Sequence, residues 1–325
     1  MSLIFKSSSL LTTVQDLGRN GFRSHGINPN GAMDKHAVRL INILLGNDEN
    51  EAVLEIHFPA PKIEFEENAV IALGGANFGA KINDQEIENW RPYFIEKNQL
   101  LSFPNKISGN RIYLSVQGGF KIENWLGSKS TNLKAQIGGF GGRKLQKDDR
   151  ILFNQRTNDK EQKANIKISN TLIPLYSSFP TVRIIEGSEW KKLNETSQTN
   201  FLSKKFTIAH NSDRMGFRLT GDKLSLTENI ELVSSAVNYG TIQLLPNGQL
   251  IILMADHQTT GGYPRIGHII LEDLSLVAQL GENDSLYFKL ISIEEAENFA
   301  LNFERDLSLL KIACQFQMNQ REFSK

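Results

Sequence analysis

A succession of short apolar runs constrains the fold of this 325-residue chain. From residue 52 onward these runs follow one another closely, divided by turn residues such as Asn83-Asp84 and Pro104-Asn105. Runs of this kind are typical of strands, and closely spaced strands with few helices between them favour a barrel or a sandwich. The pattern restarts at residues 180–187. Since a domain averages roughly 150 residues, we predict a mainly β protein with two domains, residues 1–178 and 179–325.

The composition excludes several classes of protein. Lys+Arg and Asp+Glu number 36 each, so the chain has no net charge that would attract nucleic acid or an anionic membrane. It contains no apolar run of the roughly 18 residues that a membrane-spanning helix needs. The one cysteine, Cys314, excludes an internal disulfide framework and fits a reducing compartment. The sequence therefore predicts a cytoplasmic protein without nucleic-acid or membrane partners.

Two segments carry a helical pattern. Apolar residues recur at helical spacing from Ala37 to Leu45, with Asp34 placed to cap the helix and Gly46 placed to end it. A second helix is predicted to begin near Ile293 and to continue toward the C-terminus.

Residues 13–34 form a long polar segment before the first helix. Its four glycines and Pro29 argue against a helix or a regular strand, and a loop of about twenty residues is usually functional or disordered. The embedded apolar residues favour an ordered loop. Because it leads into a helix N-terminus, whose free N–H groups attract anions, we predict a functional loop.

The most polar connection in the second half is Ala255–Pro264, which follows the apolar strand pattern of residues 250–254. A hairpin needs only about two to five residues, whereas this segment has ten, with a carboxylate, an imidazole, an amide, hydroxyls and two glycines. Glycines let a ligand approach the backbone, and free N–H groups can bind an oxyanion. The segment is either a binding loop, with Asp256 or His257 as acid or base, or a polar hairpin.

Established catalytic motifs are missing from the sequence. The six histidines show no metal-ligand spacing, so no metal site is predicted, and neither a GxSxG elbow nor a biotin-attachment pattern occurs. Residues Ser128 to Thr131 offer hydroxyls and a cation that suit a carboxylate or phosphate, with a solvated loop as the alternative. From the residues alone the chain is a polar-lined β protein of unknown substrate.

Long motifs give the sequence a family resemblance. The segments QDLGR at residues 15–19, GAMD at 31–34, DRMGFRLTG at 213–221 and QTTGGYP at 258–264 resemble the biotin-dependent carboxyltransferase family, also called allophanate hydrolase subunit 2 or the KipA-like proteins. The resemblance extends from about residue 3 to residue 290. It implies two cyclophilin-like β-barrel domains with a few helices.

Within this family, a separate chain of this length resembles the C subunits of bacterial 5-oxoprolinases. The resemblance implies one component of an ATP-dependent lactam hydrolase that opens 5-oxo-L-proline to L-glutamate together with the A and B subunits. The B subunit would be KipI-like, related to allophanate hydrolase subunit 1. ATP would be consumed by the assembled enzyme, and no biotin would be attached to this chain.

Two alternatives come from the same family. The chain could be the carboxyltransferase half of a urea-carboxylase-type enzyme, which would use carboxybiotin. It could also be a regulatory KipA-like protein that binds a KipI-like inhibitor.

The resemblance also implies site residues. A catalytic set comprises Asp256, His257 and Gln258, and a substrate-binding set comprises Gln15, Asp16, Arg19, Gly31, Met33, Asp34, Arg214, Arg218, Thr259, Thr260, Gly261, Gly262 and Tyr263. The hypothesis is that Arg214 or Arg218 pairs with a substrate carboxylate and that Asp256 handles protons. The Gln258–Thr260 edge and the N–H groups of Gly261 and Gly262 would bind the amide or its oxyanion. One departure stands at Ser234-Ser235, where relatives often carry an acidic residue after the serine.

Overall fold

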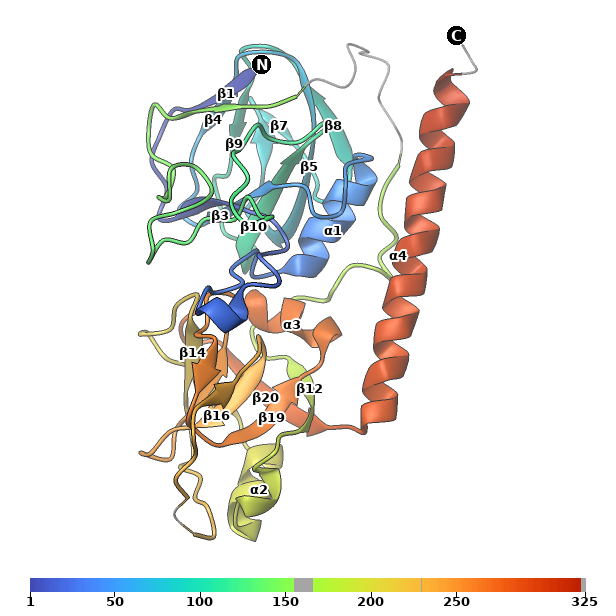
Figure 1. Ribbon diagram of the computed structural model, residues 1–325. Helices are drawn as coiled ribbons and strands as arrows, with labels where there is room; N and C mark the ends of the chain where they lie inside the picture. Colours follow the sequence, from blue (N-terminus) through green and yellow to red (C-terminus); the bar gives the residue numbers. More distant parts are fainter. Residues whose placement is uncertain (155–165, 229, 323–325) are drawn as a thin grey trace. The chain divides into compact units, whose positions relative to one another are not determined.

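The computed structural model describes residues 1–154, 166–228 and 230–322, with side chains described as far as residue 317 (Figure 1). Its contacts divide the chain into two compact units. The first unit comprises Met1–Gly18, Asp34–Pro174 and Phe303–Lys325, and the second comprises Arg19–Met33 and Leu175–Asn302. These units differ from the predicted domains, 1–178 and 179–325, because residues 19–33 group with the second unit and residues from 303 onward with the first.

The first unit contains two antiparallel sheets and a helix. A six-stranded sheet has the order β11-β1-β4-β9-β6-β7, and a five-stranded sheet has the order β2-β3-β10-β5-β8. Their bounds are β1 Ser2–Phe5, β2 Thr12–Gln15, β3 Val53–His57, β4 Ile63–Phe65, β5 Ala69–Asn77, β6 Lys81–Ile82, β7 Gln85–Glu86, β8 Pro92–Ile95, β9 Leu100–Ser102, β10 Ser108–Val116 and β11 Arg150–Leu152. Side chains from both sheets build one apolar core that includes Phe5, Leu54, Phe65 and Leu114.

Helix α1, Lys35–Leu44, packs on the five-stranded sheet beside β5 and β10 (Figure 1). Its N-cap is Asp34, whose carboxylate accepts a hydrogen bond from the Ala37 N–H at 3.0 Å. Close packing depends on Gly74 of β5, since a Cβ there would lie 2.6 Å from Ile41. Seven of the ten helix residues are buried, and Gly46 follows the helix at a φ of 68°. The predicted helix, with its cap and its stop, is confirmed.

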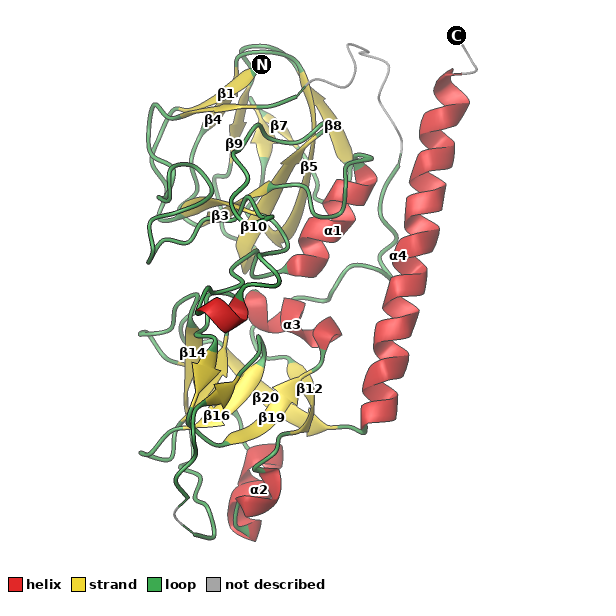
Figure 2. Ribbon diagram, viewed as in Figure 1, coloured by secondary structure: helices red, strands yellow, loops and turns green. Residues whose placement is uncertain are grey.

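The second unit is built on a closed barrel with the order β12-β19-β16-β17-β14-β13-β20 (Figure 2). Alternate strand side chains point inward and, with Phe201 from outside the barrel strands, form the second core, which includes Ile184, Ile242 and Ile252. A two-stranded ladder, β15 with β18, lies outside the barrel. The strand bounds are β12 Thr181–Glu186, β13 Phe206–Ile208, β14 Gly216–Thr220, β15 Ser235–Ala236, β16 Thr241–Leu244, β17 Leu250–Leu253, β18 Thr260–Gly261, β19 Arg265–Ile269 and β20 Ser285–Leu290.

Three α-helices follow α1 in the described residues: α2 Glu195–Ser203, α3 Leu271–Ala278 and α4 Ile293–Glu322. Short 3₁₀ turns occur at Arg23–His25 and Trp190–Lys192. The C-terminal helix predicted to begin near Ile293 is confirmed, whereas α2 and α3 carried too weak an apolar stripe to be predicted. Among the described helices, none is long and apolar enough to cross a membrane.

The mainly β prediction is confirmed, and the second unit forms a closed barrel while the strands of the first unit pair into two sheets. The prediction that residues 13–34 contain no regular strand is wrong at the start of that segment. Thr12–Gln15 is β2, which pairs antiparallel with β3. Its TTVQ sequence has the β-branched character of a strand, and the glycines that suggested a loop begin only at Gly18.

Candidate functional site

The Asp16 carboxylate ties two distant segments of the first unit together. Its oxygens accept hydrogen bonds from the hydroxyls of Ser128 at 2.8 Å and Ser130 at 2.5 Å, and from the N–H groups of Gly18 at 2.8 Å and Lys129 at 2.6 Å. Asp16, Ser128 and Ser130 are all buried. The segment from Ser128 to Thr131 therefore binds a carboxylate, as one reading of the sequence suggested, but the carboxylate belongs to the chain itself. The alternative of a solvated loop is wrong.

Two further predicted residues lie in the first unit. Gln15 is buried on β2 and donates from Nε2 to the Thr13 hydroxyl at 3.0 Å, while no described residue donates to its Oε1. Asp34 caps α1, and its backbone N–H donates to the Tyr113 hydroxyl at 2.8 Å. That hydroxyl in turn donates to Glu55 at 2.8 Å, so these buried polar groups are joined across the sheet.

The other predicted residues of the N-terminal segments, Arg19, Gly31 and Met33, lie in the second unit. A network of hydrogen bonds joins them to residues 214–257 of the same unit. Arg19 donates to Asn30 at 2.9 Å, and Asn30 donates to the Asp256 carboxylate at 2.8 Å. The Gly31 carbonyl accepts from Arg214 at 2.6 Å. Met33 lies in the second core, and its carbonyl accepts from the Tyr239 hydroxyl at 2.6 Å. These bonds are the reason that residues 19–33 group with the second unit.

Arg214 and Asp256 form a bidentate ion pair at the centre of this network. Arg214 donates to the two carboxylate oxygens at 2.9 and 3.0 Å, and the side chains are only 7% and 14% exposed. A buried pair of this geometry is strong because two charge-assisted bonds act in parallel. Arg214 and Asp256 therefore pair with each other, and this ion pair holds two loops of the second unit together. We call an internal ion pair or hydrogen-bonded cluster of this kind a tie.

A different set of side chains lies on the outer face of the barrel. Arg218 of β14 is opposite Ile251 of β17, Ile251 is opposite Gln243 of β16, and Gln243 is opposite Arg265 of β19. Their neighbours Leu219, Ile252 and Ile242 point into the core, so the four residues form one outward row across four strands. We call these four residues the outer row.

The outer row contains one residue that is exposed to solvent and one that is fully buried. Arg218 is exposed, and among the described residues its side chain has no hydrogen-bond or ion-pair partner. Gln243 is buried because the polar loop, residues 255–264, covers it. Its Nε2 donates to the Tyr263 carbonyl at 3.4 Å, and no described residue donates to its Oε1.

The loop reaches Gln243 through a glycine. A Cβ on Gly261 would lie 2.7 Å from the Gln243 Nε2 and 3.5 Å from the Gln258 Nε2. Gly261 and Thr260 form β18, opposite Ser235 and Ala236. Because Val237 donates to the Thr259 carbonyl, Gly261 and Ser235 are the next bonded pair of the antiparallel ladder. That pairing engages the Gly261 N–H, so the N–H of Gly262, outside the ladder, is the better oxyanion donor.

Arg265, at the end of the row, is held in place by Glu189. Its guanidinium donates to both carboxylate oxygens at 3.2 Å and to the Ser235 hydroxyl at 3.0 Å.

His268, two strand positions beyond Ile266, is within 3.2 Å of the Thr241 hydroxyl. Burial, together with the nearby Arg265 cation, lowers the pKa of His268 below its ordinary value of 6.5. Thus His268 is neutral at pH 7.

The second unit brings together the predicted residues from Arg214 to Tyr263, while Gln15, Asp16 and Asp34 belong to the first unit. His257 is buried, and its backbone carbonyl accepts a hydrogen bond from Asn28 at 2.6 Å. Tyr263, by contrast, is 44% exposed. Gln243, Arg265 and Glu189 were not among the predicted site residues. A lone amide inside the apolar strand pattern TIQLL was the available signal for Gln243.

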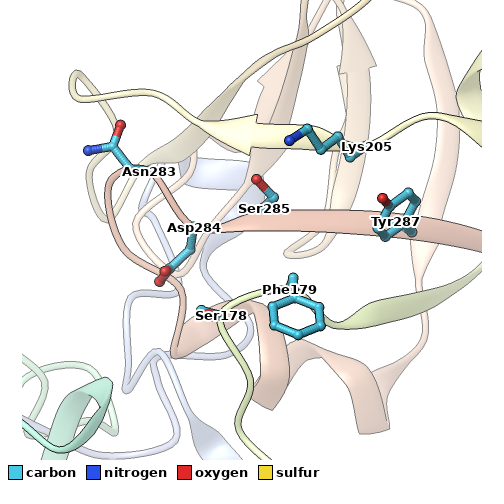
Figure 3. Close-up of a pocket in the computed structure, with 7 residues that line it drawn as sticks. All are labelled: Ser178, Phe179, Lys205, Asn283, Asp284, Ser285 and Tyr287. Carbon is cyan, nitrogen blue, oxygen red and sulfur yellow. The ribbon is translucent and has the colours of Figure 1, made fainter.

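A hollow of about 360 Å³ lies elsewhere in the second unit, beside β13 and β20, and contains none of the predicted residues (Figure 3). Two of its polar groups are already bonded, Ser285 to Thr207 at 2.9 Å and Asp284 to the Gly281 N–H at 2.8 Å. In the part of the chain that the structure describes, no three His, Cys, Asp or Glu side chains are grouped as a metal site would require.

The second unit is a closed barrel with a polar row on its outer face, and comparison with known proteins gives the family of the chain. The sequence model for the family described as carboxyltransferase domain, subdomain A and B, matches residues 25–290, and the chain belongs to this family. It is 39% identical over 284 residues to the C subunit of the 5-oxoprolinase of Haemophilus influenzae, covering 87% of this chain and 89% of that protein. It is 38% identical over 290 residues to the corresponding C subunit of Escherichia coli, covering 89% and 91%.

Among solved structures, the urea amidolyase of K. lactis is similar over 95% of this chain, with a TM-score of 0.88 and 25% sequence identity. This chain spans only 20% of that much longer protein. The family predicted from the motifs is confirmed.

Proposed function

We propose that this chain is the C subunit of a 5-oxoprolinase, which opens 5-oxo-L-proline to L-glutamate with hydrolysis of ATP. The observation that carries the proposal is the identity of 38–39% to two proteins of that name over about nine-tenths of their lengths. The A and B subunits, the latter KipI-like, would complete the enzyme, and we propose a cytoplasmic location. The ATP site is not assigned to this chain, and no covalently attached biotin is proposed.

The chemistry of the reaction sets the requirements for the site. A lactam is a poor electrophile, so its carbonyl must be activated at the expense of ATP, for example by phosphorylation, before the ring C–N bond breaks. One water supplies the new carboxylate oxygen, and a second is consumed as ATP becomes ADP and phosphate. The protein must therefore hold the substrate carboxylate, orient the ring amide and stabilise the negative charge on the former carbonyl oxygen.

The outer row supports one assignment of these tasks. Of the two arginines considered for the substrate carboxylate, Arg214 is already paired with Asp256, whereas Arg218 is exposed and has no described partner. We therefore assign the carboxylate to Arg218 and the oxyanion to the Gly262 N–H. For Asp256, a role in holding residues 28–31 onto the loop fits its three side-chain hydrogen bonds better than proton transfer does.

A second function is favoured by the structural similarity to urea amidolyase. In that alternative the chain would be the carboxyltransferase half of a urea-carboxylase-type enzyme and would move a carboxyl group to urea from carboxybiotin carried by another protein. Urea itself has no carboxylate, so in this alternative Arg218 would pair with the carboxylate that carboxybiotin supplies. In the 5-oxoprolinase assignment it pairs with the carboxylate of the substrate.

The test is glutamate release from 5-oxoproline and ATP by this chain mixed with its A and B subunits. The matched control is the same mixture without the chain, and a parallel reaction contains urea and a carrier protein already loaded with carboxybiotin. We expect glutamate and ADP to form only in the mixture that contains this chain. Release of glutamate at the same rate without it, or carboxylation of urea in place of lactam opening, would contradict the proposal.

A further inference from the structure

Gln243 presents a buried acceptor to which no described residue donates. The side chain is fully buried, and its Oε1 has no hydrogen-bond donor among the described residues. An amide oxygen buried without a partner is costly, and few such atoms occur in folded proteins. Here the atom lies under the loop whose sequence, QTTGGYP, is the strongest family motif of the chain.

The orientation of the Gln243 amide is settled by its neighbours. Oxygen and nitrogen of an amide are assigned from the hydrogen bonds they make. Nε2 lies 3.4 Å from the Tyr263 carbonyl oxygen, which can only accept. A flipped amide would place two acceptors against each other, so Oε1 is the atom left to accept from another group.

Gly261 brings the loop directly onto this amide. A side chain at residue 261 would collide with the Gln243 Nε2, with its Cβ only 2.7 Å away. The glycine therefore lets the loop backbone lie directly against the end of the Gln243 side chain. The Gln258 side chain is close to the same place, because its Nε2 would lie 3.5 Å from a Cβ on Gly261.

The position of Gln243 relative to Arg218 defines the kind of ligand. They are two strands apart in the outer row, with Ile251 between them, which corresponds to roughly 10 Å between their backbones. Ile251 leans toward Gly216, where a Cβ would lie 2.7 Å from its Cδ1. A cation and a neutral acceptor on either side of an aliphatic side chain suit a small ring that carries both a carboxylate and an amide N–H, which stand on neighbouring ring atoms in 5-oxoproline.

We propose that Gln243 is the specificity residue for the substrate, its Oε1 accepting a hydrogen bond from the N–H of a cyclic amide whose carboxylate pairs with Arg218. This inference rests on the proposed function. A site built to bond an N–H rejects an analogue that lacks it, because the buried acceptor is then left unpaired. Gln243 acts on binding and selectivity, and it takes no part in proton transfer.

The test compares two ligands that differ at one atom. Isothermal titration calorimetry of the assembled complex without ATP measures Kd for 5-oxo-L-proline and for 3-oxocyclopentane-1-carboxylate, in which CH₂ replaces the ring N–H. We expect the wild-type complex to bind the lactam roughly 5- to 150-fold more tightly. The comparison needs no mutation, so it does not depend on whether a variant folds.

The variant Gln243→Met then locates the effect. We expect its Kd for the lactam to rise by that same factor while its Kd for the ketone stays unchanged, so that the preference disappears. Its melting temperature should be equal or higher, because a buried acceptor without a donor has been removed. The control is Gln198→Met, since Gln198 donates to the Leu193 carbonyl at 3.0 Å far from the loop, and it should keep the wild-type preference.

Three outcomes would overturn the inference. Gln243→Met keeping the wild-type preference would assign the N–H to another group, and equal binding of both ligands by the wild type would mean that Oε1 meets water only. If the wild-type complex releases glutamate in either case, the proposed function survives without the Gln243 assignment. If it neither binds 5-oxoproline nor releases glutamate, both fall together.

Discussion

The Asp16 cluster and the outer row are both built from polar residues, but they differ in how many of their groups are bonded within the chain. Asp16 accepts four hydrogen bonds from residues 18 and 128–130. In the outer row, the Arg218 side chain and the Gln243 Oε1 have no described partner. The first cluster stabilises the fold and has no capacity left for a ligand, whereas the second retains a cation and an acceptor.

This difference separates residues that stabilise the fold from residues that are available to a ligand, two kinds that look the same in a sequence motif. The QDLGR motif and the polar loop at residues 255–264 both suggested substrate binding, yet Asp16 and Asp256 are internal ties. Within the second unit, polar groups without a described partner, rather than motif membership, mark the candidate binding surface. The predictions below test this division, beginning with the largest effect.

Replacing Asp16 with Ala should lower the free energy of unfolding by about 4 kcal/mol, because four buried donors lose their acceptor. Urea denaturation followed by circular dichroism measures the change. The matched control is Asp48→Ala, since Asp48 is exposed and its carboxylate accepts, among the described residues, one hydrogen bond, from the Asn50 N–H at 2.9 Å. A loss below about 1 kcal/mol in both variants would show that Asp16 is not a structural tie.

Asp256→Asn should lower stability by about 3 kcal/mol, because the buried Arg214 guanidinium loses the carboxylate charge with which it pairs. Asp306→Asn is the control, since its pairing with Arg305 at 3.3 Å is exposed to solvent and should contribute under about 1 kcal/mol. Thermal unfolding of the two variants distinguishes them. An Asp256→Asn protein of wild-type stability that no longer turns over substrate would restore the proton-transfer role.

Arg218→Met should raise KM for 5-oxoproline about 10- to 100-fold with little change in stability, because it removes the exposed cation that we assign to the substrate carboxylate. Steady-state glutamate release by the assembled complex measures it. Arg305→Met makes the same change at an exposed position on α4 and should leave KM unaltered. An unchanged KM in Arg218→Met would remove Arg218 from the carboxylate site.

The smallest effect concerns His268, whose pKa is lowered by burial and by Arg265, with Glu189 opposing. Since the unfolded chain binds the proton more readily, His268 contributes stability that is complete above pH 6.5 and is lost as the pH falls below it. Wild type should therefore lose slightly more of its melting temperature than His268→Gln between about pH 7.5 and 5.5. Parallel melting curves, or a reversed order, would show that His268 is not shielded beside Thr241.

Local patterns explain how much of the fold the sequence could predict. The strand pattern, the Asp34 cap and the beginning of α4 depend on residues within a few positions of one another, and all are found in the structure. Helix α2 was not predicted because ETSQTNFLS buries only Ser197 and Phe201. Thr12–Gln15 was misread because the glycines beyond it dominated the segment.

The site was harder to predict because it depends on pairs that are distant in the sequence. Ser128 and Ser130 look solvated until Asp16, more than 110 residues before them, is placed between them. The pairing of Arg214 with Asp256 spans 42 residues and decides which arginine remains available. For the outer row, strand register was needed, because only pairing places Gln243 between Ile251 and Arg265.

The most direct test of the division between tie and binding surface is one experiment on two variants, Asp16→Asn and Gln243→Met, in the assembled complex. Melting temperature and KM for 5-oxoproline are measured for both beside the wild type. We predict that Asp16→Asn melts several degrees lower with an unchanged KM in its folded fraction, whereas Gln243→Met keeps its melting temperature and shows a raised KM. The reverse pattern, or a raised KM at wild-type stability in Asp16→Asn, would contradict the account.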